Sequence, residues 1–186
     1  MTINKDIKNI ANTLKMKLPF FECPDIGQTP AEIINTLKIV KRQNPKIILE
    51  IGSGTGGFLY LLSALLIRSN TTFITVDSWT EGTKYEKQYD TYLSTIDKLK
   101  KFYSKNQYIH IRGKSEDKRV ISRLKEILKN NKIDFLFIDG NHTYQSVLSD
   151  WGNYRGFMSK NSIVAFHDII EYKDVNKAWK KNNFGK

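Results

Sequence analysis

The sequence predicts an α/β protein built on a doubly wound, mainly parallel sheet of about five strands, with helices on both faces. Three observations predict this fold. Short apolar segments alternate with helical segments from residue 45 onward. These segments are apolar on both faces, which suits strands covered on two sides. A glycine-rich turn follows the first strand and opens an apolar helix. We therefore expect one domain over 1–186, with a helical cap at 1–44 and the core at 45–186.

The N-terminal part of the chain predicts two helices. The first is expected over residues 3–17, where apolar side chains recur at helical spacing, namely Ile3, Ile7, Ile10 and Leu14. The second begins at Pro30, because Thr29 is a cap residue and Glu32 follows it at the spacing of a capping box. This helix should end at about Gln43.

The rest of the chain predicts alternating strands and helices. Strands are expected at Ile47–Ile51, Thr72–Val76, Tyr108–Ile111, Ile133–Ile138 and Ile163–Phe166. The apolar stretch Phe58–Ile67 is too short to span a bilayer and suits a buried helix. The insertion 78–106 reads as helical from about Gly82 to Tyr103, and we expect it either to pack on the sheet or to cover a ligand. A short helix is expected over 174–181.

Charge and cysteine content restrict the classes of function. The net charge is +11, and residues 101–132 carry ten Lys/Arg against three Asp/Glu. This distribution favours a solvated basic helix over a nucleic-acid surface, although it does not exclude nucleic acid. Cys23 is the single cysteine, so an internal disulfide is excluded. Without a secretory signal or a membrane-spanning segment, the sequence predicts a cytoplasmic protein that does not bind a membrane.

The glycine-rich turn predicts a nucleotide-type cofactor site in a Rossmann-like core. Its glycines let the main chain turn sharply and approach a ligand, and the helix start offers N–H donors. Gly52, Gly54 and Gly57 match the dinucleotide pattern GxGxxG. Glu50, Gly52, Gly54 and Gly56 instead match ExGxGxG, the pattern of S-adenosylmethionine (SAM)-dependent methyltransferases. The turn alone leaves NAD and SAM open.

The end of the second strand strengthens the cofactor prediction. Asp77 closes this strand 20 residues after Gly57, and its two carboxylate oxygens can accept both ribose hydroxyls of an adenosine. This position suits NAD and SAM equally. Trp79 is expected either to stack on the adenine ring or to pack in the core.

Polar residues at two later strand ends separate the two cofactors. Asp139 and His142 follow the fourth strand, and His167 and Asp168 follow the fifth. Ligands of open α/β sheets bind outside the carboxyl ends of the strands, so these side chains should converge near the glycine turn. Two carboxylates and two imidazoles predict a site for a divalent cation. A nicotinamide-dependent dehydrogenase has no evident use for them.

These residues lie in a segment that resembles a known family. From about Lys46 to Trp179 the chain resembles class I SAM-dependent methyltransferases of the sugar and antibiotic O-methyltransferase type, the cephalosporin hydroxylase-like group. The most specific part is IDFLFIDGNHTY at 133–144, followed by Asp150 and by VAFHD at 164–168. The resemblance implies transfer of the SAM methyl group to a hydroxyl of a small-molecule or glycan acceptor.

The resemblance also implies roles for individual residues. The amino-acid end of SAM would be held by the turn residues Glu50, Gly52, Ser53, Gly54 and Gly56. Asp77 would bind the ribose, and Ser115 would border the adenine. In metal-dependent members the residues at the positions of Asp139 and Asp168 hold Mg²⁺, and His167 stands where certain relatives carry an acidic ligand. His142 stands where some relatives place a general base, beside Asp139.

Other readings stay open. Family members usually continue with an antiparallel hairpin that no residues remain to form here, which predicts an exposed edge at the fifth strand and a homodimer that covers it. The alternatives are a nucleic-acid methyltransferase, a truncated non-catalytic SAM-binding domain and an NAD-dependent oxidoreductase. The acceptor pocket is expected to be built from the 78–106 insertion and the N-terminal helices.

Overall fold

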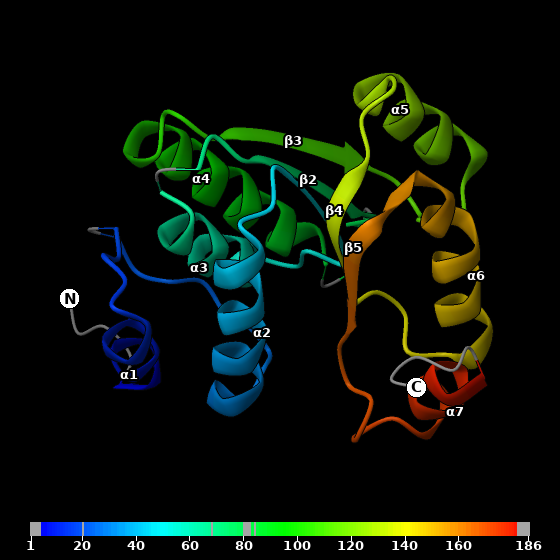
Figure 1. Ribbon diagram of the computed structural model, residues 1–186, viewed down its shortest axis with the longest axis horizontal. Coiled ribbons are helices and arrows are strands. Elements are labelled where there is room, and N and C mark those ends of the chain that lie inside the picture. Colours follow the sequence, from blue (N-terminus) through cyan, green and yellow to red (C-terminus); the bar gives the residue numbers. More distant parts are fainter. Residues whose placement is uncertain (1–4, 20, 68, 80–82, 84, 182–186) are drawn as a thin grey trace. The chain divides into compact units, whose positions relative to one another are not determined.

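The computed structural model describes residues 5–19, 21–67, 69–79, 83 and 85–181 (Figure 1). Ile3 and Gly82, near which two predicted helices begin, lie outside these residues. The helices and strands follow one another as α1 (Lys5–Leu14), α2 (Pro30–Gln43), β1 (Ile47–Ile51), α3 (Gly57–Leu65), β2 (Thr72–Asp77), α4 (Glu86–Phe102), β3 (Gln107–Arg112), α5 (Lys118–Leu128), β4 (Ile133–Ile138), α6 (Tyr144–Tyr154), a 3₁₀ turn (Arg155–Phe157), β5 (Met158–Phe166) and α7 (Lys173–Lys181).

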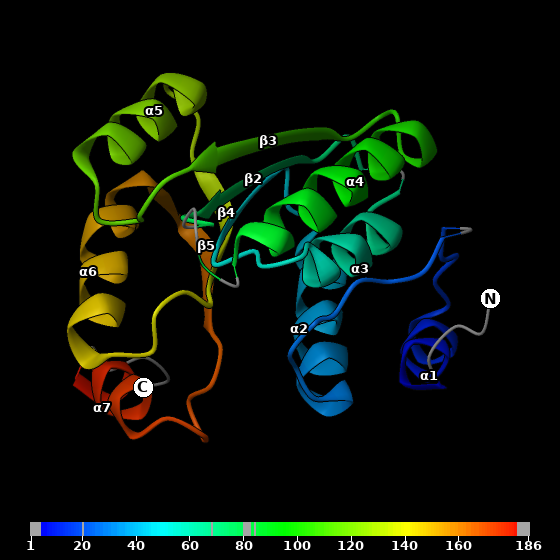
Figure 2. The ribbon, with the colours of Figure 1, turned by 180° about the vertical axis from the view of Figure 1, so that it is seen from behind.

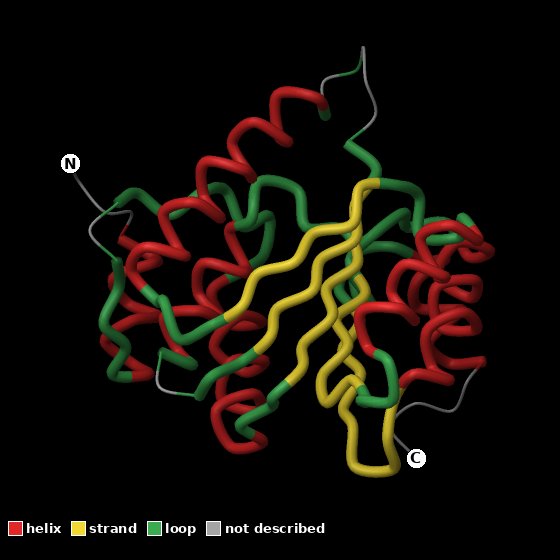
Figure 3. The backbone as a smooth tube through the Cα atoms, turned by 90° about the horizontal axis from the view of Figure 1, so that it is seen from above, coloured by secondary structure: helices red, strands yellow, loops and turns green. Residues whose placement is uncertain are grey.

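The five strands form one sheet in the order β3-β2-β1-β4-β5, and Figure 3 shows them side by side. β1 pairs in parallel with β4, and β4 pairs in parallel with β5. The chain runs outward from β1 in one direction through β2 and β3, then returns to β4 on the other side of β1. The carboxyl ends of β1 and β4 therefore flank a topological switch point, where ligands of such sheets bind. The predicted Rossmann-like α/β fold is confirmed.

The chain divides into two compact units, which are described separately. The first comprises Met1–Lys46, Ser53–Phe73 and Trp79–Tyr108, with helices α1 to α4. The second comprises Ile47–Gly52, Ile74–Ser78 and Ile109–Lys186, with β1, β4, β5 and helices α5 to α7. The division of the sequence at residue 45 stays a prediction.

The core of the second unit joins the sheet to α5 and α6. It contains Leu49 from β1 and Leu136 from β4, both fully buried. α5 adds Val120, Leu124 and Leu128 at helical spacing, while its Lys118, Arg119 and Lys125 are exposed. The basic residues of α5 therefore lie on the solvent face of an amphipathic helix, as the composition predicted.

The helices of the first unit start where the sequence signals place them. Thr29 and Glu32 form the predicted capping box at the start of α2. α3 is buried on nearly every side, which its continuously apolar sequence requires. α1 packs on α2, and α3 packs on both α2 and α4 (Figure 2). No helix in the described part of the chain is long and apolar enough to cross a membrane.

β5 begins five residues earlier than the sequence predicts. Its first part is polar and exposed, and the pairing with β4 shifts register between Ile133 and Phe135. There the Ser162 hydroxyl donates to the Ile133 carbonyl oxygen at 2.6 Å. Apolar patterning misses this part because residues 159–162 are all polar. β5 is the last strand of the sheet, its apolar residues are half-buried, and no further strand follows it within the described residues.

Candidate functional site

Main-chain hydrogen bonds fix the strand ends of the second unit. The first residue after each of four strands still donates its N–H to a neighbouring strand. These bonds join Gly52 to Val76, Gly113 to Asp77, Asp139 to Ile51 and His167 to Ile138, with N···O distances of 2.8, 2.9, 2.8 and 3.0 Å. The residues predicted to carry chemistry after β1, β4 and β5 therefore start from fixed main-chain positions.

Gly52 begins the glycine turn and must be a glycine for two reasons. Its φ is 85°, in the left-handed region that disfavours residues with a Cβ. A Cβ at this position would also overlap the main-chain carbonyl of Asp139. The turn after β1 thus lies directly against the residue after β4. The carboxylate of Glu50, two residues before, is buried at 3% exposure.

The rest of the glycine turn, from Ser53 onward, belongs to the first unit and offers hydrogen-bonding groups to a ligand. Gly54 has a φ of 50°, and a Cβ there would meet nothing within 4 Å. The Ser53 hydroxyl is buried and has no hydrogen-bond partner among the described residues. Gly56, with a φ of 85°, caps α3, whose first N–H groups have no side-chain acceptor from the cap residue. A buried donor at a helix N-terminus suits a carboxylate ligand.

Trp79 supports the glycine turn from within the first unit. Its indole N–H donates to the Gly54 carbonyl oxygen at 2.8 Å. The ring is fully buried, with the rings of Tyr89 and Tyr92 at centroid distances of 4.9 and 4.6 Å. Stacking of Trp79 on an adenine ring stays a prediction. The contact that the structure gives this residue is the hydrogen bond to the turn.

Asp77 and Ser115 lie in the second unit, at the ends of neighbouring strands. Asp77 is half-buried at the end of β2, and its carbonyl receives the Gly113 N–H. Ser115 lies two residues after Gly113, and its carbonyl oxygen accepts a hydrogen bond from the Tyr154 hydroxyl at 2.8 Å. The predicted ribose and adenine contacts are therefore on linked segments.

Asp150 is a buried carboxyl group to which the sequence assigned no role. Its side chain on α6 is 1% exposed, and its Oδ1 has no hydrogen-bond partner among the described residues. Burial raises the pKa of Asp150 to about 6; a hydrogen bond from Ser115 lowers it, and the charge of Glu116 raises it. A Cβ added to Gly140 would lie 3.4 Å from Oδ2 of Asp150. Asp150 thus packs beneath the segment that carries Asp139.

The two carboxylates and two imidazoles predicted at the ends of β4 and β5 do converge. His167 Nδ1 lies 2.9 Å from Asp139 Oδ1 and 3.2 Å from Asp168 Oδ2. His142 Nε2 lies 3.0 Å from Asp168 Oδ2 and 3.7 Å from Asp139 Oδ1. One donor atom from each residue lies within 4.8 Å of the other three. We call these four residues the Asp/His cluster.

The Asp/His cluster is partly open to solvent. Exposure of its side chains falls from 32% for His142 to 18% for Asp139, 10% for His167 and 7% for Asp168. The pKa of His142 is raised, chiefly by the nearby Asp139 side chain and also by the charge of Asp168, although burial and the charge of His167 lower it. The Tyr172 ring, with its centroid 4.3 Å from that of His142, restricts the imidazole. Sequence reasoning missed Tyr172.

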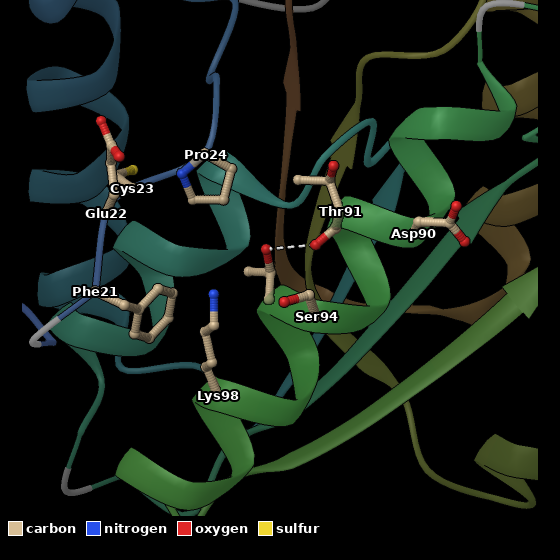
Figure 4. Close-up of a pocket in the computed structure, with 9 residues that line it drawn as sticks. Phe21, Glu22, Cys23, Pro24, Asp90, Thr91, Ser94 and Lys98 are labelled. Atoms are coloured by element: carbon tan, nitrogen blue, oxygen red, sulfur yellow. Dashed lines mark hydrogen bonds between the residues drawn. The ribbon is translucent and has the colours of Figure 1, made fainter.

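A pocket of about 470 Å³ lies in the first unit, between the segment before α2 and one face of α4 (Figure 4). It is lined by Phe21, Glu22, Cys23, Pro24, Asp90, Thr91, Ser94, Thr95 and Lys98. Both walls contact the glycine turn. Thr95 donates to the Thr55 carbonyl oxygen at 3.3 Å, and the Thr55 hydroxyl donates to the Asp25 carbonyl oxygen at 2.9 Å. The pocket therefore adjoins the predicted cofactor-binding turn.

Cys23 lines this pocket but is a poor nucleophile. Burial raises the pKa of its thiol to about 12, with a further contribution from Asp25. A thiol of this kind stays protonated near neutral pH. The structure supports a packing role for Cys23.

Comparisons with known proteins agree with this geometry. A family model described as a methyltransferase domain matches residues 49–169. An uncharacterized protein of Acanthamoeba polyphaga mimivirus is 36% identical over 64 residues, which are 34% of this chain and 28% of that protein.

Solved structures share the fold. CalS11, a TDP-rhamnose 3'-O-methyltransferase of calicheamicin biosynthesis, superposes with a TM-score of 0.61 at 16% identity, over 95% of this chain and 83% of that one. An O-methyltransferase from Bacillus cereus in complex with SAH gives a TM-score of 0.60 at 16% identity, over 97% and 80%.

Proposed function

The chain belongs to the methyltransferase domain family, and from this we propose that it is a SAM-dependent O-methyltransferase acting on a hydroxyl of a small molecule or sugar. The convergence of Asp139 and His142 with His167 and Asp168 at the switch point carries this proposal. The fold shared with a sugar O-methyltransferase and with an SAH-bound O-methyltransferase supports it.

The residues of the glycine turn fit SAM. Ser53 has a buried hydroxyl to offer, and Gly54 leaves space that a Cβ would fill. We assign the methionine end of SAM to Glu50, Ser53 and the start of α3, and its ribose to Asp77. When bound, SAM supplies a methyl group on a positively charged sulfur, so the chain mainly has to orient the acceptor and accept its proton.

We assign the proton to His142. Its Nε2 faces Asp168 and Asp139, so the hydroxyl proton would enter at Nδ1, and the carboxylates would stabilise the resulting imidazolium. As the acceptor oxygen bonds to the methyl carbon, the carbon–sulfur bond breaks and its electron pair stays on sulfur. Asp139 holds His167 and contacts His142, so we assign it the positioning of this group.

Magnesium does not fit the Asp/His cluster well. Mg²⁺ prefers an octahedron of oxygen ligands and keeps several waters, whereas an imidazole nitrogen of His167 contacts both carboxylates here. We therefore derive no step from Mg²⁺.

We propose the pocket between residues 21–24 and α4 as the acceptor site. It lies in the segments that the sequence predicted for it, and three of its side chains carry hydroxyls, namely Thr91, Ser94 and Thr95. Lys98, with its Nζ 5.2 Å from the Phe21 ring centroid, adds a positive charge. Such a lining suits a polar, hydroxyl-bearing acceptor.

Calorimetric titration with SAM, SAH and NADH tests the cofactor assignment. We expect micromolar binding of SAM and SAH, no response to NADH, and weaker SAM binding by Ser53→Ala. Binding of NADH alone would refute the proposal.

The variant Asp139→Ala tests the assignment at β4. We expect turnover to be lost while SAM affinity changes only a few-fold. Loss of SAM binding by the folded variant would instead make Asp139 a cofactor-site residue.

The remaining sequence-based expectations stay proposals. A homodimer would cover the half-buried β5 edge, and a cytoplasmic location agrees with the composition. Nucleic acid as the acceptor stays an alternative proposal, which the solvated basic face of α5 alone does not require.

A further inference from the structure

We infer that Asp139, His167 and Asp168 bind a divalent first-row transition-metal ion and that the site prefers such an ion to Mg²⁺. The inference concerns the identity of the ion and needs no methyltransferase activity, because binding is measured directly. It rests on the spacing of three donor atoms, on their chemistry and on their burial.

The donor atoms have a spacing that suits one ion as well as it suits the hydrogen bond between His167 and Asp139. Two ligands about 2.1 Å from a metal are about 3.0 Å apart at right angles and about 3.4 Å apart in a tetrahedron. His167 Nδ1 lies 2.9 Å from Asp139 Oδ1 and 3.2 Å from Asp168 Oδ2. The two carboxylate oxygens lie within 4.8 Å of each other. A small movement would place all three around one ion.

The chemistry of the donors selects the class of ion. An imidazole nitrogen suits ions such as Fe²⁺, Co²⁺, Ni²⁺ and Zn²⁺, whereas Mg²⁺ takes oxygen ligands. His167 is the more buried of the two imidazoles, at 10% exposure against 32% for His142. Its main-chain N–H is fixed on the Ile138 carbonyl oxygen, so its position in the cluster is set by the sheet.

Charge favours a dication at this position. The carboxylates of Asp139 and Asp168 both contact the His167 nitrogen, and Asp168 is only 7% exposed. Two carboxylates held this close favour a positive charge beside them. A divalent ion would neutralise both.

His142 is assigned a place outside the coordination shell. Its Nε2 is 3.0 Å from Asp168 Oδ2. At this distance His142 can hydrogen-bond the carboxylate of Asp168 while that carboxylate binds the ion. This leaves His142 able to accept a proton at Nδ1, as proposed above. The two histidines of the cluster are thus given different roles, which variants can separate.

The experiment is a titration of chelator-treated, untagged protein with Co²⁺ and with Mg²⁺. Calorimetry gives both affinities, and the visible absorption of Co²⁺ reports its coordination. We expect Co²⁺ to bind at least about 100-fold more tightly than Mg²⁺. Equal affinities in the wild-type protein would overturn the inference.

Three variants identify the ligands, each first checked for its thermal unfolding temperature. His167→Asp supplies an oxygen in place of the nitrogen, so we expect about 10- to 100-fold weaker Co²⁺ binding and tighter Mg²⁺ binding. His142→Gln should keep Co²⁺ affinity within a few-fold. His110→Gln removes an exposed histidine on β3 and is the matched control.

The outcomes separate this inference from the proposed function. An unchanged ratio of Co²⁺ to Mg²⁺ affinity in folded His167→Asp would overturn it, as would loss of Co²⁺ binding in His110→Gln. Loss in His142→Gln would overturn the three-residue ligand set. SAM binding in the same preparations tests the proposed function independently, so either can fail while the other holds.

Discussion

Replacing Asp150 by asparagine should change how the stability of the fold depends on pH. Asp150 is 1% exposed, and burial raises its pKa from the ordinary 3.8 to about 6. Between about pH 4 and pH 6, the Asp150 carboxyl group therefore stays protonated in the folded protein but is ionised in the unfolded chain. The free energy of unfolding should fall as the pH rises from about 4 to about 6, since ionisation of Asp150 is opposed only in the folded protein.

The size of this effect follows from the two pKa values. One pKa unit corresponds to about 1.4 kcal/mol, so the difference between 3.8 and about 6 amounts to at most about 3 kcal/mol. Asp150→Asn cannot ionise and should lose this part of the pH dependence. At pH 7 it should be more stable than the wild type by up to the same amount.

Chemical denaturation followed by circular dichroism at several pH values between 4 and 8 measures this. The change in unfolding free energy between pH 4 and 6 is the deciding quantity, because absolute stability also depends on how the new amide packs. Asp97→Asn, which removes an exposed carboxylate on α4, is the control and should keep the wild-type profile. An identical fall between pH 4 and 6 in Asp150→Asn would refute the reasoning.

Two further predictions concern the glycine turn. Gly52→Ala should abolish SAM binding in a calorimetric titration and destabilise the fold by more than about 1–2 kcal/mol, because the left-handed φ and the contact with the Asp139 carbonyl both exclude a Cβ. Its control is Gly152→Ala, at an exposed position of α6, which should be neutral or stabilising by up to about 1 kcal/mol. Trp79→Phe removes the donor to the Gly54 carbonyl, so SAM affinity should fall while thermal unfolding reports a loss of about 1 kcal/mol or slightly more; unchanged SAM affinity would show that the turn does not need this bond.

Local signals in the sequence predicted most of the fold. The strands β1 and β4 were predicted at their observed bounds, and β2 and β3 to within one residue, because their apolar runs are interrupted by polar or turn residues at both ends. The capping box at Thr29 fixed the start of α2. β5 was predicted too short, because its first part is largely polar and carries no apolar pattern.

The candidate site was predictable where it depends on strand ends. The Asp/His cluster was found because parallel strands bring their carboxyl ends to one edge. The hydrogen bond from Trp79 to Gly54 and the burial of Asp150 were not found, since each depends on packing between segments far apart in the sequence. The different roles expected for His142 and His167 came from the resemblance, whereas the distances from each imidazole nitrogen to the carboxylates are known only from the structure.

The main-chain hydrogen bonds that extend the strand ends by one residue affect which side chains of this protein can be substituted without disturbing the fold. Asp139 and His167 are placed by their own N–H groups, through the Ile51 and Ile138 carbonyls, and not by their side chains. The chemistry at these positions can therefore be exchanged while the scaffold keeps its geometry, which makes them natural targets for redesign of ion or substrate preference. Gly52 is the opposite case, because the same close approach that shapes the site leaves no room for any other residue. Substitution of the two side chains should accordingly change the chemistry but keep the fold, whereas substitution of the glycine should disturb the fold itself.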